Sequence, residues 1–283
     1  MRKIKIIADS TCDLGQVLAK QYDIEIVPLY IVIDETSYKD GLEITPEEIY
    51  EWSDCNGKTP KTAAVGMDVA LEYLKKFDEE NTDLLVFGIS EEMSSTCNVF
   101  RLVGEELEHA KIYVIDSRNL STGIGLQVLR AAELAASGMP AEEIVTRIEQ
   151  TRDKVRASFV VETLTYLQRG GRCNAVTALV ASALQLKPEI TVQDGKMGVA
   201  KKYRGGIESV TLKYAKDLKE ELLKADSRRV FITHSGSDQK VIDSVYAFLK
   251  ELDYFEEIHI TRAGGVISSH CGPKTLGILF YES

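Results

Sequence analysis

Residues 84–96 read LLVFGISEEMSST, an apolar run followed at once by a glycine and by hydroxyl and acidic residues. The run Leu84–Phe87 has the length of a buried strand. The polar residues after it open a helical pattern that is expected to extend from Ser94 to Glu108. Hydroxyl side chains and unpaired backbone N–H groups therefore meet at a predicted junction between a strand and a helix.

The same order of apolar run, turn and helical periodicity occurs at Ile4–Ala8 and at Lys111–Ile115. Repeated units of this kind predict a parallel sheet covered by helices. The helices are expected at Leu14–Gln21, Thr45–Ser53, Met67–Phe77, Ser94–Glu108 and Ser121–Ala136.

Polar residues follow each of the three predicted strands: Asp9-Ser10, Ser90–Ser94 and Asp116-Ser117. They are expected at the carboxyl edge of the sheet, where open α/β sheets bind ligands. For the acids Asp9, Asp13 and Asp116, an ordinary helix cap or turn is the favoured interpretation.

The pattern changes near Arg156. A strand is expected at Ala157–Val161, then a short helix at Leu164–Gln168, and Asp194-Gly195 predicts a hairpin turn. A further α/β alternation is expected at Val230–His234, Lys240–Leu252, Glu257–Ile260 and Leu276–Tyr281. A chain of 283 residues exceeds the usual size of a single core, so we expect two α/β domains, residues 1–156 and 157–283, with a ligand in the cleft between them.

Composition excludes several classes of function. The net charge of −10 gives no general attraction to nucleic acid or to an anionic membrane, and no apolar run is long enough to span a bilayer. Arg2 and Lys3 precede a short strand rather than a signal-peptide core, which favours a cytoplasmic protein. The five cysteines are widely spaced and form no Cys-x-x-Cys or Cys/His pattern, so neither a metal nor a disulfide framework is expected.

Three polar side chains stand where apolar sequence stops, far apart along the chain: Thr62, Ser94 and His270. Thr62 belongs to a predicted polar turn, Pro60–Ala64, and His270 to the glycine- and proline-bounded segment Gly264–Pro273. If they meet, their hydroxyl and imidazole groups suit a carboxylate at the polar end of an apolar ligand, because a buried carboxylate needs hydrogen bonds.

The rest of such a ligand would need an apolar tunnel. Residues Asn174–Leu186 form a predicted helix that is apolar around nearly its whole circumference and must be buried. This helix either lines a tunnel or is simply part of the core, and on periodicity alone the core is favoured.

Several short segments, in order along the chain, resemble the DegV family, bacterial fatty-acid-binding proteins that carry an acyl chain for a fatty acid kinase. They are Ala8–Thr11, Pro60–Thr62, Ile89–Thr96, Ile115–Ser117, Leu167–Arg172, Lys187-Pro188, Lys202–Gly205 and His270–Pro273. The resemblance implies a two-domain α/β fold with the ligand in the interdomain cleft. It also implies a C14–C18 fatty acid as the ligand and no cofactor.

The resemblance further implies roles for individual residues. Thr62 and Ser94 match the residues that hold the acyl carboxylate, His270 lies near the same head group, and Ser95 is counted with them as ligand-binding. Arg172 and Arg204 match surface arginines that engage the kinase catalytic subunit, so substitution of Arg172 is expected to spare fatty acid retention and impair phosphorylation.

The chain departs from the family pattern at three positions. Ala63 replaces a serine, so one hydroxyl is missing beside Thr62. Ser95 and Lys274 stand where glycine is usual, which changes the shape or charge of the ligand entrance.

An enzyme is the alternative interpretation: a hydrolase or transferase that acts on a small polar substrate, with Ser94 as nucleophile and His270 as base. No Gly-x-Ser-x-Gly elbow surrounds Ser94, which counts against it. A nucleic-acid-binding module is disfavoured by the acidic balance. No Walker or dinucleotide-binding motif is present, so catalysis is expected to reside in a partner.

Overall fold

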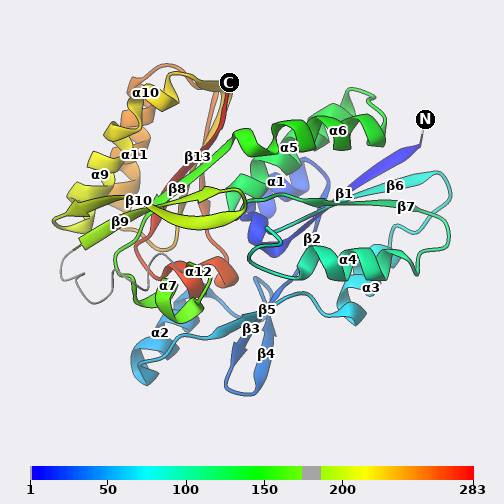
Figure 1. Ribbon diagram of the computed structural model, residues 1–283, viewed down its shortest axis with the longest axis horizontal. Helices are drawn as coiled ribbons and strands as arrows, with labels where there is room; N and C mark the ends of the chain where they lie inside the picture. The colour runs from blue at the N-terminus through cyan, green and yellow to red at the C-terminus, as the bar shows by residue number, and fades with distance from the viewer. Residues whose placement is uncertain (1, 174–185) are drawn as a thin grey trace.

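The computed structural model describes residues 2–173 and 186–283, and its strands form three sheets surrounded by helices (Figure 1). The predicted helix Asn174–Leu186 lies outside the described residues except for Leu186, which begins a strand.

The first sheet is parallel and has four strands in the order β2-β1-β6-β7. These strands are β1 (Lys3–Asp9), β2 (Ile24–Val27), β6 (Thr82–Gly88) and β7 (Lys111–Asp116). Residues of β6 are buried along its whole length because helices cover both faces of the sheet. The predicted parallel sheet is confirmed, and β2 is a strand that the sequence pattern did not indicate.

Helices pack on both faces of the parallel sheet. Helices α5 (Thr122–Ala136) and α6 (Ala141–Thr151) contact its central strands from one side, while α3 (Met67–Lys75) and α4 (Thr96–Gly104) lie on the other. Helix α1 (Gly15–Gln21) packs against β2. Helix α4 begins later than predicted because Ser94 bonds within the preceding turn, and it also ends earlier than predicted, at Gly104.

The second sheet has six strands, in the order β10-β9-β8-β13-β11-β12, and only the β11–β12 pair is parallel. Its strands are β8 (Val155–Val160), β9 (Leu186–Gln193), β10 (Lys196–Arg204), β11 (Ala225–His234), β12 (Glu257–Arg262) and β13 (Leu276–Glu282). The predicted hairpin at Asp194-Gly195 is confirmed, and both of its turn residues have positive φ.

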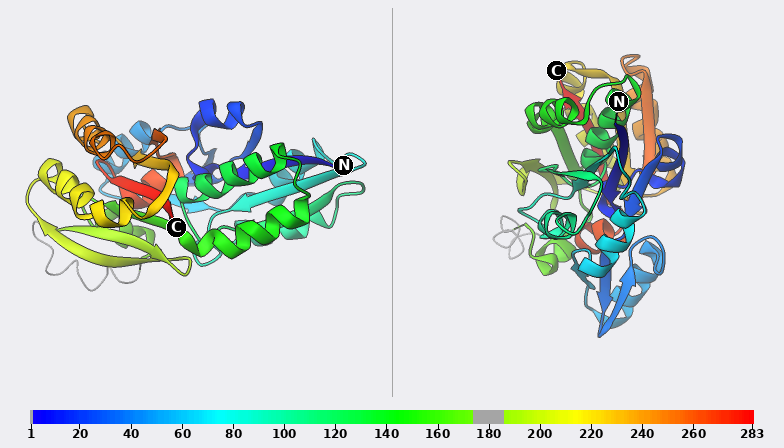
Figure 2. Two further views of the ribbon diagram at one scale, coloured as in Figure 1. Left: turned by 90° about the horizontal axis from the view of Figure 1, so that it is seen from above. Right: turned by 90° about the vertical axis from the view of Figure 1, so that its right-hand side faces the viewer.

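Helix α5 joins the two larger sheets. It contacts β1 and β6 of the parallel sheet and also β8 and β13 of the six-stranded sheet. Helices α9 (Ile207–Asp217) and α11 (Gln239–Glu251) cover the other face of the six-stranded sheet (Figure 2). The short helix α10 (Lys219–Leu222) follows α9 along the chain. The boundary expected between residues 156 and 157 stays a prediction, and strand β8 runs across that position.

A third sheet is small, antiparallel and ordered β4-β3-β5. It consists of β3 (Tyr30–Ile33), β4 (Thr36–Lys39) and β5 (Lys61–Ala63), and α2 (Pro46–Asn56) connects β4 to β5. The expectation of a polar turn at Pro60–Ala64 was wrong, because Thr62 pairs with Ile31 inside this sheet. A strand of three partly exposed residues carries too little periodicity to be predicted.

The remaining elements are short. They are α7 (Thr165–Gly170), α12 (Gly265–Cys271) and the 3₁₀ turns η1 (Ser10–Cys12) and η2 (Arg152–Lys154). Helix α12 contacts α2, α7, β3, β5 and η1. It is therefore surrounded by segments from both halves of the chain.

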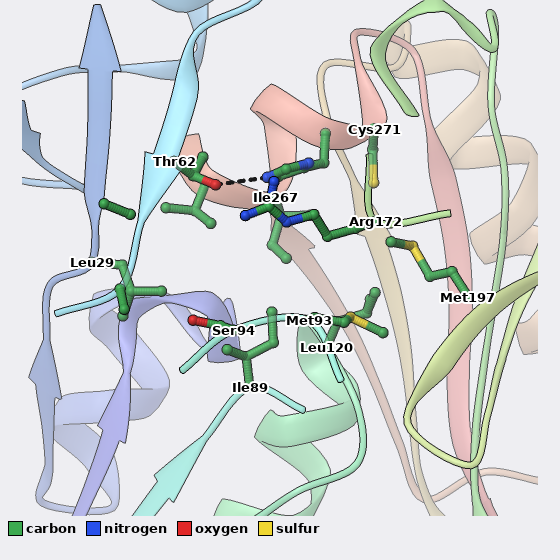
Figure 3. Close-up of a pocket in the computed structure, with 14 residues that line it drawn as sticks. Leu29, Thr62, Ile89, Met93, Ser94, Leu120, Arg172, Met197, Ile267 and Cys271 are labelled. Atoms are coloured by element: carbon green, nitrogen blue, oxygen red, sulfur yellow. Dashed lines mark hydrogen bonds between the residues drawn. The ribbon is translucent and has the colours of Figure 1, made fainter. Parts of the chain in front are cut away.

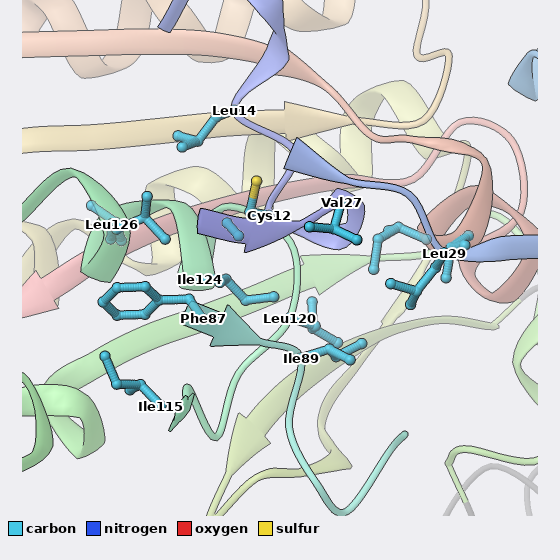
Figure 4. Close-up of a cluster of buried hydrophobic side chains, with 14 of the residues drawn as sticks. Cys12, Leu14, Val27, Leu29, Phe87, Ile89, Ile115, Leu120, Ile124 and Leu126 are labelled. Atoms are coloured by element: carbon cyan, nitrogen blue, oxygen red, sulfur yellow. The ribbon is translucent and has the colours of Figure 1, made fainter. Parts of the chain in front are cut away.

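The main hydrophobic core extends across both larger sheets, and a second buried cluster lies under α9 and α11. Figure 4 shows the part of the main core at the end of β6, where Leu29, Ile89 and Leu120 approach one another. These three side chains also line the cavity described below, so the wall of that cavity is continuous with the core.

Gly277 marks a close approach of backbones inside the six-stranded sheet. A Cβ at this position would lie 2.7 Å from the Ser158 carbonyl oxygen and 3.0 Å from Phe159 Cβ. We expect Gly277→Ala to lower the free energy of unfolding by about 1–3 kcal/mol through overpacking. Chemical denaturation measures the change.

Gly198 of the edge strand β10 is the matched control, because a Cβ there meets no atom within 4 Å. Gly198→Ala should leave stability unchanged or slightly raised, since alanine reduces the freedom of the unfolded chain. Equal stability of the two variants would contradict the assignment of Gly277 as a packing constraint.

Candidate functional site

One small cavity brings together Thr62 from β5, Ser94 from the loop before α4, and His270 from α12 (Figure 3). The cavity holds about 50 Å³, which is room for a few water molecules or a carboxyl group. Apart from Arg172, its remaining lining is apolar or small: Leu29, Ala63, Ala64, Ile89, Met93, Leu120, Met197, Val266, Ile267 and Cys271.

Thr62 and His270 are hydrogen-bonded to each other, with 2.7 Å between Thr62 Oγ1 and His270 Nε2. Burial, followed by the positive charge of Arg172, lowers the pKa of His270 to about 4. The imidazole is therefore neutral at pH 7, with one ring nitrogen as donor and the other as acceptor. His270 Nδ1 is buried and has no hydrogen-bond partner in the described part of the chain.

Helix α12 fixes the position of His270, and the sequence analysis did not predict this helix. Within the segment Gly264–Pro273, which glycines and a proline bound, residues 265–271 form a helix. Carboxyl oxygens of Asp13 and Asp40 accept hydrogen bonds from the first backbone N–H groups, Gly264 N at 2.8 Å and Gly265 N at 2.7 Å. A helix terminus needs such partners, and here they come from distant parts of the chain.

The ring of His270 also packs directly against α7. A Cβ on Gly170 would lie 2.2 Å from His270 Nδ1, so only glycine leaves room for the ring in this position. Gly170 and Gly171 follow the predicted helix Leu164–Gln168, and glycine commonly ends a helix. Gly171 does so, with φ 68°, whereas Gly170 provides space for the site.

Ser94 lies in a tight loop that the β9–β10 hairpin holds in place. Ser94 Oγ is 2.9 Å from Thr96 Oγ1, and Ser90 Oγ donates to the Gly195 carbonyl at 2.8 Å. Ser94 is half-buried and faces the cavity, so its hydroxyl can also meet a ligand. Ser95 does not line the cavity: it is exposed at the N-terminus of α4 and makes no capping hydrogen bond.

The two arginines occupy different places. Arg172 is exposed, donates to the Gly170 carbonyl at 2.8 Å, and extends toward Thr62 as part of the cavity lining (Figure 3). Arg204 is exposed at the end of β10 and does not line this cavity. The motif around Arg172 did not indicate that its guanidinium would lie beside the Thr62–His270 pair, because that direction depends on how α7 packs on α12.

A second cavity, of about 20 Å³, shares Leu120, Ile267 and Cys271 with the first. Phe159 and Leu279 of the six-stranded sheet contribute to its other walls. Sequence reasoning missed the apolar residues around both cavities, because apolar side chains carry no signal that separates cavity lining from core.

The hydrogen bonds do not form the nucleophile–base pair of the alternative interpretation. Ser94 Oγ bonds Thr96, and His270 Nε2 bonds Thr62. Within residues 2–173 and 186–283, no group of three or more His, Cys, Asp or Glu side chains is arranged to hold a metal ion. No helix in that part of the chain is long and apolar enough to cross a membrane.

Comparisons with known proteins agree on one family. A family model described as the DegV family matches residues 3–283. A DegV domain-containing protein of Clostridium perfringens is 34% identical over 100% of this chain and 99% of its own length.

Solved structures of similar proteins cover nearly the whole chain. A DegV family protein of Thermus thermophilus, described for its fatty acid binding, has a TM-score of 0.88 and 30% identity, with 100% of both chains covered. A stearic acid-binding protein of Eubacterium ventriosum has a TM-score of 0.86 and 26% identity, with 99% of this chain and 98% of its own covered. The predicted α/β fold with a parallel and a second sheet is confirmed.

The charge of Arg172 should influence His270 measurably. Because this charge helps to lower the histidine pKa, Arg172→Gln should raise the pKa of His270 from about 4 toward its usual value. Arg204→Gln is the control and should leave it unchanged, since Arg204 does not line the cavity. NMR titration of the His270 ring, assigned by loss of its signal in His270→Gln, measures both; equal midpoints in the two arginine variants would contradict the geometry.

Proposed function

The chain belongs to the DegV family, and we propose that it binds a long-chain fatty acid and presents the carboxyl group to a fatty acid kinase. The observation that carries this proposal is the Thr62–His270 hydrogen bond inside an otherwise largely apolar cavity that Ser94 also lines. Similar proteins described as binding fatty acids support it.

The carboxylate of the ligand is held by the hydroxyls of Thr62 and Ser94. When neutral His270 donates Nε2–H to Thr62 Oγ1, the Thr62 hydroxyl proton remains available to the ligand. A buried carboxylate without such donors would cost several kcal/mol. His270 therefore orients the threonine hydroxyl, and Ser94 supplies the second donor.

We call the cavity lined by Thr62, Ser94 and His270 the head-group cavity. The acyl chain extends from it toward the second cavity, between α12 and the six-stranded sheet. Leu120, Ile267 and Cys271 belong to both cavities and so mark the route. Together the cavities are far smaller than a C14–C18 chain, so binding requires these apolar side chains to move apart. The cost is offset by burial of the methylene groups, at about 0.8 kcal/mol each.

The chain acts as a carrier, and the phosphoryl transfer that forms the acyl phosphate takes place on the kinase catalytic subunit. Arg172 and Arg204 are both exposed, and their guanidinium groups suit an acidic or phosphate-bearing partner surface. The proposal places the protein in the cytoplasm and requires no cofactor. The hydrolase alternative has no observation in its favour, since Ser94 and His270 bond to other groups.

Fatty acid should co-purify with the protein, and its retention should depend on Thr62. Thr62→Val removes one hydrogen bond to a charged group, so affinity should fall about 10- to 100-fold. Native mass spectrometry and extraction identify the bound lipid, and a palmitate-binding titration gives the affinity.

Thr36→Val provides the matched control, because Thr36 is an exposed threonine in β4 of the same small sheet. It should retain wild-type affinity. A wild-type protein that neither contains fatty acid nor takes it up, or equal affinities of the two threonine variants, would overturn the proposed function.

The two arginines should matter for phosphorylation rather than for retention. Arg172→Ala and Arg204→Ala are each expected to keep bound fatty acid and to slow acyl phosphate formation by the kinase at least several-fold. Arg147→Ala is the control, since Arg147 is an exposed arginine on α6 that pairs with Glu143. Loss of lipid from the arginine variants comparable to that from Thr62→Val would contradict this division of roles.

A further inference from the structure

We propose that residues 9–13, Asp9-Ser10-Thr11-Cys12-Asp13, form a positioning turn. This turn fixes the segments that line the head-group cavity relative to one another and does not touch the ligand. This inference rests on the proposed function. The first side chain of the turn, Asp9, is fully buried at the end of β1. Its Oδ2 accepts a hydrogen bond from Ile89 N at 2.7 Å, and Ile89 lines the cavity at the start of the loop that leads to Ser94.

Ser10 connects two further walls. Its hydroxyl accepts from Leu29 N at 3.1 Å and donates to Asp40 Oδ2 at 2.7 Å. Leu29 lines the cavity and directly precedes β3, the strand that pairs with β5 at Thr62. The other oxygen of Asp40 accepts from Gly265 N of α12.

Asp13 connects the last two walls. Its Oδ1 accepts from Gly264 N at 2.8 Å, directly before the helix that carries His270. Its Oδ2 accepts from the Ser121 hydroxyl at 2.5 Å, and the neighbouring Leu120 lines the cavity. The positioning turn, together with Asp40, therefore reaches the segments that contribute Thr62, Ser94, His270 and Leu120.

This arrangement costs stability, which argues against simple packing. Asp9, Asp13 and Asp40 are at most 5% exposed, and no salt bridge to them is found among the described residues. Burial raises the pKa of Asp9 to about 6 and that of Asp13 to about 8, so both carboxyl groups are disfavoured as anions. Apolar side chains would fill the same space at a lower cost in folding free energy, but they could not accept hydrogen bonds from backbone N–H groups of separate segments.

The test compares palmitate with 1-hexadecanol, which has the same chain and no carboxylate. Ser10→Ala and Asp40→Asn should each lower the palmitate-to-hexadecanol affinity ratio about tenfold while the affinity for hexadecanol stays within twofold of wild type. If these residues only stabilised the fold, the substitutions would lower the affinities for both ligands equally. Circular dichroism first establishes that each variant is folded. If Asp40→Asn does not fold, the milder variant Ser10→Ala carries the test.

Two controls carry similar changes elsewhere. Asp83→Asn alters a buried carboxylate of β6 that accepts from Arg2, and Ser158→Ala removes a buried hydroxyl of β8 that bonds Tyr214. Neither residue lines the cavity, so both variants should keep the wild-type ratio. A ratio that is unchanged in Ser10→Ala and Asp40→Asn, or equally reduced in the controls, overturns the proposal.

A measurement without ligand separates this proposal from the proposed function. In the lipid-free protein, Ser10→Ala and Asp40→Asn should raise the pKa of His270, measured by NMR, because a displaced α12 exposes the ring; the controls should not. If wild type fails to bind palmitate but His270 responds as expected, the proposed function fails and the positioning turn stands. If palmitate binds and His270 does not respond, the positioning turn fails alone.

Discussion

The arrangement of this molecule depends on the hydrogen bonds by which two buried carboxyl groups, those of Asp13 and Asp40, hold the start of α12. Buried carboxyl oxygens need hydrogen-bond donors, and the N–H groups at a helix N-terminus need acceptors, so each group satisfies the other. The bonds to Gly264 and Gly265 span more than 220 residues of sequence. They seat a helix from the end of the chain among elements from its beginning, and His270 consequently lies opposite Thr62.

In the head-group cavity, by contrast, the polar groups are not all hydrogen-bonded. Around residues 9–13, both oxygens of each buried carboxyl group take part in hydrogen bonds, whereas at the cavity the Nδ1 atom of His270 has no partner in the described part of the chain. Hydroxyl groups and a neutral imidazole beside apolar walls suit an acceptor-rich group on an apolar ligand. The exposed guanidinium of Arg172 lies at the same place, and its positive charge helps to keep the imidazole neutral.

The sequence predicted those elements whose residues carry local periodicity. The buried runs of β1, β6 and β7 and the Asp194-Gly195 turn were recognisable because a few adjacent residues determine them. Strand β5 and helix α12 were not, since β5 has only three residues and α12 begins at glycines held by distant acids. Likewise, Thr62, Ser94 and His270 stood out as polar residues at the ends of apolar sequence, whereas the direction of Arg172 and the exposure of Ser95 follow from tertiary packing.

The two ends of a fatty acid would meet walls of different stiffness. The head-group walls are joined by hydrogen bonds with fixed directions, so they tolerate little displacement and discriminate by chemistry. The route beyond them is bounded by Ile267, Leu120 and, near the head group, Met93 and Met197, and the unbranched thioether side chains adapt readily to a changed shape. Under the proposed function, the fold itself would select a carboxylate, whereas selection of chain length would depend on apolar contacts that single substitutions can change.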